Sequence, residues 1–450
     1  MPLTPQSESW SAVQTEGFLA PETPADGRAV LPLLPEERPP GFEWRTGIKA
    51  VLDLGSTKAT CLIGRALSNG SLQVLGWGWR RSEGINSGAI IDTRRVEAVI
   101  RATVGDAEKQ AGRRIDELVL NLSCGNPQSY HIDTEMMIGG REVTLDDVRD
   151  LLDDARYRAF HEDRRLVHTL PLGFNVDETP AVPNPCGHQC NHLLGKFHLI
   201  DANTSALRTL STVLHRADLR LSGLVSSPFA SGLAVLDHDE RDLGVTVVEM
   251  GAGTTSLAVF SHGRLLYTAQ LRVGGHHITR DIASALSVHT DTAEWLKTMH
   301  GAAQPVSDDD HHIIPLPAGQ GTGMTRLPRS KLVSIIAPRI EETLEMTRHA
   351  LESANLGRLT EGRVVLTGGA SLLNDLGPVA ARIFGRQVRL GQPRGIHNLP
   401  ENSTISAGFS TAAGLLAWSA GAEDAFCLPE ENTVSRGPMK RLVNLIRRHV

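Results

Sequence analysis

Apolar and polar positions follow the same order in two separate stretches of the chain. Residues 49–66 (KAVLDLGSTKATCLIGRA) contain an apolar strand pattern that runs into Asp53, then a turn rich in glycine and hydroxyls, then a second apolar strand pattern. Residues 245–260 (VTVVEMGAGTTSLAVF) repeat this order around Glu249. A further turn and a third strand pattern follow each stretch. We therefore predict two strand–turn–strand units that arose by internal duplication.

The turn of each unit has the residue types of a phosphate-binding loop. Glycine allows backbone angles that are closed to other residues and lets a ligand approach the main chain. Successive N–H groups in such a turn form a concave site for phosphate oxygens, and hydroxyls and a lysine add donors and charge. We expect the phosphates of a nucleotide to be bound by Gly55, Ser56, Thr57 and Lys58 in the first unit and by Gly251, Ala252, Gly253, Thr254 and Thr255 in the second.

A carboxyl group ends the first strand of each unit, Asp53 in one and Glu249 in the other. Mg²⁺ prefers oxygen ligands and keeps several of its waters, so these two acids are candidates to hold Mg²⁺ through water. One such unit by itself could be an ordinary tight turn. Two copies in matching strand context favour a triphosphate site between two halves.

A third motif supports a nucleotide site. The apolar run VVLT enters a turn at Gly368 and Gly369, followed by Ser371, and a helix is predicted to open at Leu372. Adenosine or phosphate could pack on this backbone at the start of the helix. The Walker A pattern is absent from the sequence, which excludes a P-loop NTPase.

Two other segments have helical patterns that bear on the site. Residues 405–418 run into a helix of small residues, which would let two helices cross closely between the halves. Glu294 and Lys297 lie three residues apart on a predicted helix. They could form a surface ion pair of small energetic value, or they could reach the ribose hydroxyls.

Charge is distributed unevenly along the 450 residues, whose net charge is −6. Residues 1–46 are acidic and rich in proline, which predicts a disordered tail. Residues 418–437 are predicted to be a linker. The last thirteen residues, 438–450 (PMKRLVNLIRRHV), carry four cations and no acid. The mildly acidic balance of the whole chain argues against a nucleic-acid partner, which would require a basic surface.

The terminal segment has the pattern of an amphipathic helix, with apolar side chains on one face and cations on the other. Such a helix binds an anionic membrane surface, although a helix docked on its own domain remains an alternative. The sequence lacks both a spanning apolar run and a secretory signal, and its five scattered cysteines fit a reducing compartment. The residues expected at the membrane are Met439, Lys440, Arg441, Leu442, Val443, Leu445, Ile446, Arg447 and Arg448.

These motifs resemble the actin/Hsp70/sugar-kinase superfamily and, more closely, the FtsA family of bacterial cell-division proteins. VLDLGSTKATCLIG is similar to the first phosphate motif, and SSPFASGLAVLDHDERDLGVTVVEMGAGTTSLAVF to a connecting helix with the second phosphate motif. VVLTGGASLLNDL is similar to the adenosine motif and STISAGFSTAAGLL to the second connecting motif. LRVGGHHITRDIA is family-like as well, which implies that Gly274 and Gly275 bind the nucleotide. The resemblance implies an α/β fold of duplicated, actin-like (ribonuclease H-like) halves.

The resemblance also implies the four FtsA subdomains 1A, 1C, 2A and 2B. Subdomain 1A would comprise residues 47–243 and 397–417, with subdomain 1C, an SHS2 domain, inserted at about 123–202. This insertion contains a helical pattern that begins at the capping-type Thr144. Subdomain 2A would comprise residues 244–396, with subdomain 2B inserted at about 276–361.

By similarity, such a protein binds ATP with Mg²⁺ and polymerises with itself on the cytoplasmic side of the inner membrane at the division septum. It tethers the FtsZ ring through its terminal helix and recruits late divisome membrane proteins through 1C. The FtsZ tail would bind 2B, where Arg329 and Arg339 fit the family pattern. Alternatively, these arginines pair with Glu341 and Glu342 on a solvated helix face. Other members of the superfamily, such as a pilus-assembly scaffold or a sugar kinase or phosphatase, are the alternative to an FtsA function.

The sequence departs from the family pattern in the second phosphate motif, which is usually close to D-I-G-G-G-T-T-D and here is E-M-G-A-G-T-T-S. Glu249 is one methylene longer than aspartate, and Ala252 replaces a glycine. Because phosphoryl transfer depends on positioning, we expect ATP binding with weak or absent hydrolysis.

A second departure is the alternation of cysteine and histidine at Cys186, His188, Cys190 and His192. All four are zinc-type ligands, but alternate residues of a strand rarely converge on one tetrahedral ion. A zinc site and a metal-free loop or strand both remain open.

Overall fold

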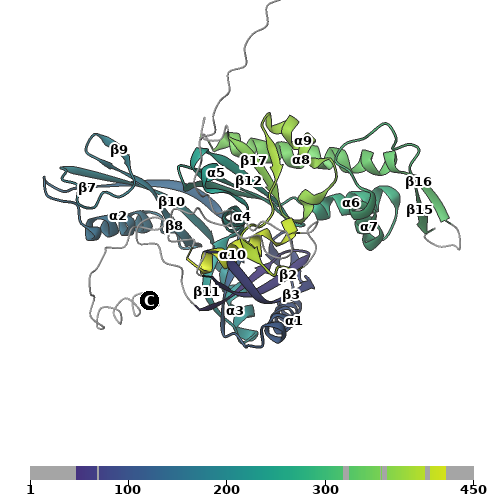
Figure 1. Cartoon of the computed structure of the whole chain (residues 1–450), viewed down its shortest axis with the longest axis horizontal. Helices are drawn as coiled ribbons and strands as arrows, with labels where there is room; N and C mark the ends of the chain where they lie inside the picture. Colours follow the sequence, from purple (N-terminus) through teal and green to yellow (C-terminus); the bar gives the residue numbers. More distant parts are fainter. Residues whose placement is uncertain are drawn as a thin grey trace, which may run out of the picture. The chain divides into compact units, whose positions relative to one another are not determined.

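The computed structural model describes residues 47–67, 70–317, 324–354, 356, 362–400 and 406–421 (Figure 1). The predicted acidic tail, most of the predicted linker and the predicted terminal amphipathic helix lie outside these residues. In the part of the chain that is described, no helix is both long and apolar enough to cross a membrane.

The first half is built on a mixed sheet. Within the described residues its strand order is β11-β6-β1-β2-β3-β19. The first predicted strand–turn–strand unit is the antiparallel pair β1–β2, and β6 and β11 run parallel to β1. Helices α1 and α3 pack on one face through buried aliphatic side chains. The elements are β1 (Ile48–Leu54), β2 (Lys58–Ala66), β3 (Leu72–Arg81), α1 (Thr93–Ala111), β6 (Glu117–Leu122), α3 (Thr204–Arg216), β11 (Arg220–Ser226) and β19 (Ile396–His397).

The second half repeats this arrangement. Its strand order, again within the described residues, is β14-β13-β12-β17-β18, with β12–β13 antiparallel and β17 parallel to β12. Strand β12 therefore corresponds to β1, β13 to β2, β14 to β3 and β17 to β6, which confirms the predicted duplication. The elements are β12 (Val245–Met250), β13 (Thr255–Ser261), β14 (Arg264–Leu271), β17 (Arg363–Thr367), α9 (Leu376–Phe384) and β18 (Val388–Leu390).

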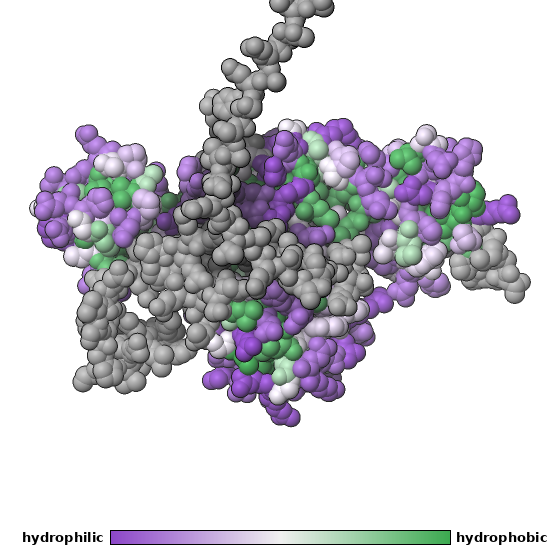
Figure 2. All heavy atoms as spheres, viewed as in Figure 1, coloured by the Kyte–Doolittle hydropathy of each residue, from purple (hydrophilic) through white to green (hydrophobic). Residues whose placement is uncertain are grey.

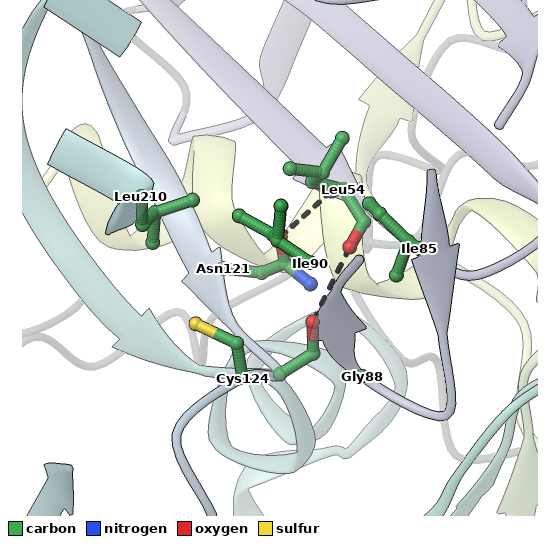
Figure 3. Close-up of a pocket in the computed structure, with 8 residues that line it drawn as sticks. Leu54, Ile85, Gly88, Ile90, Asn121, Cys124 and Leu210 are labelled. Atoms are coloured by element: carbon green, nitrogen blue, oxygen red, sulfur yellow. Dashed lines mark hydrogen bonds between the residues drawn. The ribbon is translucent and has the colours of Figure 1, made fainter. Parts of the chain in front are cut away.

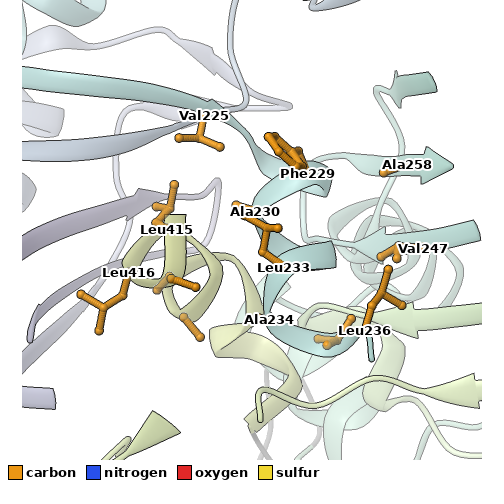
Figure 4. Close-up of a cluster of buried hydrophobic side chains, with 14 of the residues drawn as sticks. Val225, Phe229, Ala230, Leu233, Ala234, Leu236, Val247, Ala258, Leu415 and Leu416 are labelled. Carbon is orange, nitrogen blue, oxygen red and sulfur yellow. The ribbon is translucent and has the colours of Figure 1, made fainter. Parts of the chain in front are cut away.

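Two helices of small and apolar residues, α4 (Ser227–Val235) and α10 (Ser410–Ser419), cross where the halves meet (Figure 4). The crossing is tight, because a Cβ added to Gly414 would lie 1.7 Å from the carbonyl oxygen of Ala230. Both helices belong to one buried cluster with strand residues of each half, among them Val51 and Val247. The close helix crossing predicted from the small residues is confirmed. The short helix α5 (His238–Leu243) leads from α4 into β12.

The insertion in the first half forms a sheet of its own with the strand order β7-β10-β8-β9 and one helix, α2. Thr144 and Asp147 make reciprocal capping bonds at the start of α2, as expected for a helix beginning there. Phe174 and Phe197 pack edge to face in its core, with ring centroids 6.1 Å apart. The elements are β7 (Gln128–Met137), α2 (Leu145–Arg158), β8 (Arg164–Val176), β9 (Thr179–Val182) and β10 (His192–Asn203).

The insertion in the second half is mainly helical. It contains α6 (Gly275–Leu286), α7 (Thr290–His300), the hairpin β15–β16 (Ile313–Pro317 and Met324–Pro328) and α8 (Arg329–Ser353). On the face drawn in Figure 2, hydrophobic residues form small groups separated by hydrophilic ones. Scattered exposed apolar side chains of this kind are ordinary for a protein surface.

One predicted helix start is wrong. The turn at Gly368 and Gly369 opens a single 3₁₀ turn, Gly369–Leu372, and α9 begins only at Leu376. Ser371 donates its hydroxyl to the carbonyl oxygen of Gly368 at 2.7 Å, which stabilises the tight turn. The glycine motif is therefore followed by a short turn rather than by the N-terminus of a long helix.

Candidate nucleotide site

The two predicted phosphate turns face each other. A Cβ added to Gly253, in the turn of the second unit, would lie 2.3 Å from the Oγ of Ser56 in the first. Real Cβ atoms do not approach a neighbour so closely, so only glycine fits at this point. The fold thus brings together two glycine-containing turns that lie far apart in the sequence.

Asp53 lies next to the last residue of β1 and is half-buried. Burial raises the pKa of this carboxyl to about 6, although the nearby cation of Lys58 opposes the shift. The Lys58 amine donates to the carbonyl oxygen of Gly408 at 2.6 Å and lies 3.7 Å from the centroid of the Phe409 ring. Lys58 therefore stands beside the acid, and its amine is anchored to the segment that precedes α10. An ammonium group has three donors, which leaves capacity for phosphate.

Glu249 occupies the corresponding place at the end of β12. Its Oε1 accepts a hydrogen bond from the Thr411 hydroxyl at 2.5 Å, whereas its buried Oε2 has no hydrogen-bond partner. Burial raises the pKa of Glu249 to about 7; the Thr411 bond opposes the shift, and the charge of Asp53 adds to it. Two half-buried carboxyls, one with a buried oxygen that has no hydrogen-bond partner, are suited to a divalent cation.

The donor set fits Mg²⁺ held partly through water. Among the described residues, no group of three or more histidine, cysteine or acidic side chains could enclose a metal ion. An ion held by Asp53 and Glu249 would therefore complete its shell with phosphate oxygens and waters, as Mg²⁺ commonly does.

The two glycines at the start of α6 pack directly on the second turn. The N–H of Gly275 donates to the carbonyl oxygen of Gly251 at 3.0 Å, and a Cβ added to Gly274 would lie 2.6 Å from that oxygen. Gly368 belongs to the same group, because a Cβ there would lie 2.6 Å from the carbonyl oxygen of Met250. Backbone from three predicted motifs thus meets at the end of β12.

Glu294 and Lys297 of α7 reach the same region. The Lys297 amine lies 2.7 Å from the Glu294 carboxylate, so the ion-pair alternative is present in the structure. The same amine donates to the carbonyl oxygen of Gly275 at 3.1 Å and to the Thr279 hydroxyl at 2.9 Å. The pair therefore borders the glycine motif rather than standing apart on the surface.

One predicted phosphate hydroxyl is used elsewhere. Thr255 is buried at the start of β13, and its hydroxyl donates to the carbonyl oxygen of Val273 at 2.9 Å. Its side chain stabilises the connection between β14 and α6, so it holds the site in shape.

A further hairpin joins the site and was not predicted from the sequence. Strands β4 (Ile85–Asn86) and β5 (Ala89–Ile90) are linked by Ser87 and Gly88, both with positive φ. The N–H of Gly88 donates to the Ser56 hydroxyl at 3.3 Å, and a Cβ at Gly253 would lie 2.9 Å from the Cα of Ser87. The string INSGAI carried the signal, because two turn residues between apolar positions favour a tight hairpin.

A small pocket lies behind this hairpin (Figure 3). Side chains from the first half line it. The Leu54 N–H donates to the Asn121 amide oxygen at 2.7 Å and the Ser123 hydroxyl donates to the Leu54 carbonyl oxygen at 3.3 Å, and these two bonds brace the end of β1. Its lining residues are Leu54, Ile85, Gly88, Ile90, Asn121, Ser123, Cys124 and Leu210.

The two arginines predicted for FtsZ binding are both engaged within the second insertion. Arg329 pairs with the buried Asp309 and donates to the carbonyl oxygen of His300 at 2.8 Å. Arg339 pairs with Asp281 at 2.6 Å and also with Glu342. The alternative of pairing with Glu342 is therefore found for Arg339, while Arg329 has a different acid.

The cysteine and histidine alternation lies mainly in the loop before β10, and His192 begins that strand. Cys190 is buried in the core of the first insertion, and His192 pairs with Glu135 at 3.2 Å. These contacts draw the side chains in different directions, and the absence of a metal group among the described residues applies to this segment too.

Comparison with known proteins identifies the family. The family description "Cell division protein FtsA" matches residues 246–414, and "SHS2 domain inserted in FTSA" matches residues 124–201. The chain is 38% identical over 385 residues to the cell division protein FtsA of Rhizobium meliloti (strain 1021), covering 83% of this chain and 87% of that protein. It is 29% identical over 377 residues to the FtsA of Escherichia coli (strain K12), covering 81% and 88%.

Solved structures of low sequence identity share the fold. A type IV pilus biogenesis complex of PilM and PilN matches with a TM-score of 0.61 at 18% identity, covering 84% of this chain and 99% of that one. MreB 5 of Spiroplasma citri bound to AMPPNP matches with a TM-score of 0.51 at 11% identity, covering 90% and 100%. These likenesses confirm the predicted fold of duplicated, actin-like halves.

Proposed function

The chain belongs to the FtsA family of cell-division proteins, and on this premise we propose that it is an ATP-binding scaffold of the division septum. In this proposal it binds ATP with Mg²⁺ between its halves and polymerises with itself on the cytoplasmic side of the inner membrane. It tethers the FtsZ ring through its C-terminal segment and recruits late divisome membrane proteins through the first insertion, subdomain 1C.

The observation that carries the nucleotide proposal is the meeting of the two turns with a half-buried acid beside each. Gly253 lies against Ser56, and both Asp53 and Glu249 have raised pKa values because of burial. Bound Mg²⁺ would supply positive charge that offsets this burial and screens the phosphates. Asp53 and Glu249 would orient its waters, and Lys58 would donate to a phosphate oxygen.

We expect ATP hydrolysis to be weak because the carboxyl group of Glu249 is restrained and cannot turn freely. Its Oε1 is bound by Thr411 of α10, and its side chain is one methylene longer than the aspartate of the family pattern. Hydrolysis requires a water placed in line with the terminal phosphate. A carboxyl bound to the crossing helix is poorly placed to adjust to that water.

The proposals of FtsZ binding and membrane binding both depend on cationic side chains of this chain. An acidic peptide could recruit Arg329 or Arg339 by exchanging its carboxylates for their present partners, at the cost of breaking those ion pairs. The basic amphipathic pattern of residues 438–450 favours an anionic lipid surface. One short helix of this kind binds weakly, so polymerisation would strengthen attachment by multivalency.

The decisive experiment is co-sedimentation of the full-length protein with anionic liposomes, MgATP and FtsZ, with and without residues 438–450. We expect the full-length protein to carry FtsZ into the liposome pellet and the truncated protein to leave it in the supernatant. Neutral liposomes are the control for the charge requirement. Failure of the full-length protein to bring FtsZ to anionic liposomes would overturn the proposal.

A further inference from the structure

His276, the residue after Gly274 and Gly275, connects the two phosphate turns. Its Nε2 lies 2.5 Å from the hydroxyl oxygen of Thr57 in the first turn. Its backbone N–H donates to the carbonyl oxygen of Ala252 in the second turn at 2.8 Å. The imidazole therefore spans the gap between the halves at the level of the predicted phosphates.

The surroundings of the imidazole are half-buried and polar. Lys297 and Arg280 are close enough to lower its pKa and Glu294 to raise it, while burial is the largest influence and lowers the pKa. Lys297 is anchored to the carbonyl oxygen of the adjacent Gly275 at 3.1 Å. A histidine that only filled a core would face apolar side chains, whereas this ring nitrogen points at a hydroxyl expected to bind phosphate.

We propose that His276 binds a phosphate group of the nucleotide and that its bond to Thr57 closes the cleft until the nucleotide enters. A ring nitrogen 2.5 Å from the Thr57 hydroxyl stands next to any phosphate oxygen that this hydroxyl binds, so a rotation of the imidazole would bring the nitrogen within hydrogen-bond distance of it. In the tautomer that carries a proton on Nε2, this N–H donates to the Thr57 hydroxyl oxygen. When a phosphate displaces that contact, the N–H loses its acceptor, and a half-buried polar atom without a partner is costly. The phosphate itself supplies the replacement acceptor.

The inference rests on the proposed ATP site and adds a ligand from the second half. A purely structural role for the Thr57–His276 bond makes the opposite prediction. In that case the bond competes with the nucleotide, and its loss would leave the affinity unchanged or raise it.

The test is the dissociation constant of the full-length protein for MgATP and for MgADP, measured by isothermal titration calorimetry. We expect His276→Ala to weaken binding of MgATP about 10-fold, in line with loss of a hydrogen bond to a charged group. His276→Gln should retain affinity within about threefold, because its amide reaches near the position of Nε2. The matched control is His289→Ala, at an exposed histidine just before α7.

Each outcome decides between the two roles. Unchanged or tighter binding of both nucleotides by His276→Ala would overturn the inference while leaving the proposed ATP site intact. A wild-type protein that binds neither nucleotide would overturn both. If His276→Ala does not fold, His276→Gln and His276→Asn are compared instead, because asparagine reaches only the position of Nδ1. Tighter binding by the glutamine variant supports the inference, and equal binding contradicts it.

Discussion

The two phosphate units have the same backbone but hold their acids differently. Asp53 stands beside Lys58, whose charge stabilises the carboxylate. Glu249 has Thr254 at the position that matches Lys58, and it is held by a hydroxyl of α10. Its second oxygen has no partner. The acid of the first unit thus has a cation from its own turn, whereas the acid of the second unit depends on a hydroxyl of helix α10.

This difference indicates that, after the duplication, the two units came to stabilise their acids through different partners. The ends of β6 and β17 still make matching bonds to the first residues of the crossing helices: Asn121 to Ser227 at 3.1 Å and Thr367 to Ser410 at 2.7 Å. The next residue is Pro228 in α4 and Thr411 in α10. Pro228 has no hydroxyl to offer an acid, whereas Thr411 donates its hydroxyl to Glu249. The acid of the second unit is therefore bound to the crossing helix α10.

The largest expected effect comes from breaking the crossing on which both units depend. Gly414→Val would place a branched side chain where even a Cβ lies 1.7 Å from the carbonyl oxygen of Ala230. We expect loss of folded protein or a destabilisation of more than about 4 kcal/mol in urea unfolding. The matched control is Gly105→Ala in α1, where an added Cβ meets no atom within 4 Å. A folded Gly414→Val protein of wild-type stability would contradict the tight crossing.

The second prediction compares the cation of the first unit with its counterpart. Lys58→Ala should weaken MgATP binding by about 10- to 100-fold, the range for loss of a charged hydrogen bond. Thr254→Ala, at the matching position of the second unit, should weaken it by less than about fivefold, as expected for a neutral hydroxyl. Calorimetric titration measures both. Equal losses would show that the two turns contribute alike and would remove the asymmetry.

The third prediction concerns the acid of the second unit. Glu249→Asp shortens the side chain and releases it from Thr411, so phosphate release per ATP should rise by about 10-fold from a slow wild-type rate. Asp53→Glu, the reciprocal change in the first unit, serves as control and should not raise turnover. Fast ATP hydrolysis by the wild-type protein that Glu249→Asp leaves unaltered would contradict the proposal of a restrained acid.

The smallest effect sharpens the comparison of the two crossing helices. His168 accepts the N–H of Ser226, just before α4, at 3.1 Å, and burial lowers its pKa to about 4. Between pH about 6.5 and about 4 the unfolded chain binds a proton there that the native protein does not, so stability falls as the pH falls. His198, whose pKa burial lowers to about 3, acts in the same direction.

Replacing His168 isolates its share of this dependence. His168→Gln keeps an acceptor for Ser226 but cannot titrate, so it should recover about 1 kcal/mol of the stability lost at about pH 5.5. Urea unfolding at a series of pH values measures this, with the exposed His289→Gln as control. If the free energy of unfolding of His168→Gln depends on pH as that of the wild type does, protonation of His168 does not contribute to the pH dependence.

Much of this architecture could be predicted because its signals are local. Apolar alternation into Asp53 and Glu249 marks the paired strands, and the small residues around Gly414 mark the close crossing. The helix start after Gly369 was misplaced because helix ends depend on hydrogen bonds with neighbouring segments as well as on local composition. The Ser87–Gly88 hairpin was missed although its turn signal is short and clear.

The sequence by itself determined that the chain has two duplicated halves, glycine-containing turns, an acid beside each turn and inserted subdomains. Only the tertiary structure decided how these residues are used. It placed the Lys58 amine on Gly408, Thr411 on Glu249 and His276 on Thr57, each pair joining segments more than a hundred residues apart. The physical reason is the distance along the sequence over which each effect acts. Propensity and periodicity act within a few residues, whereas the partners of a buried polar group are chosen by the packing that excludes water around it.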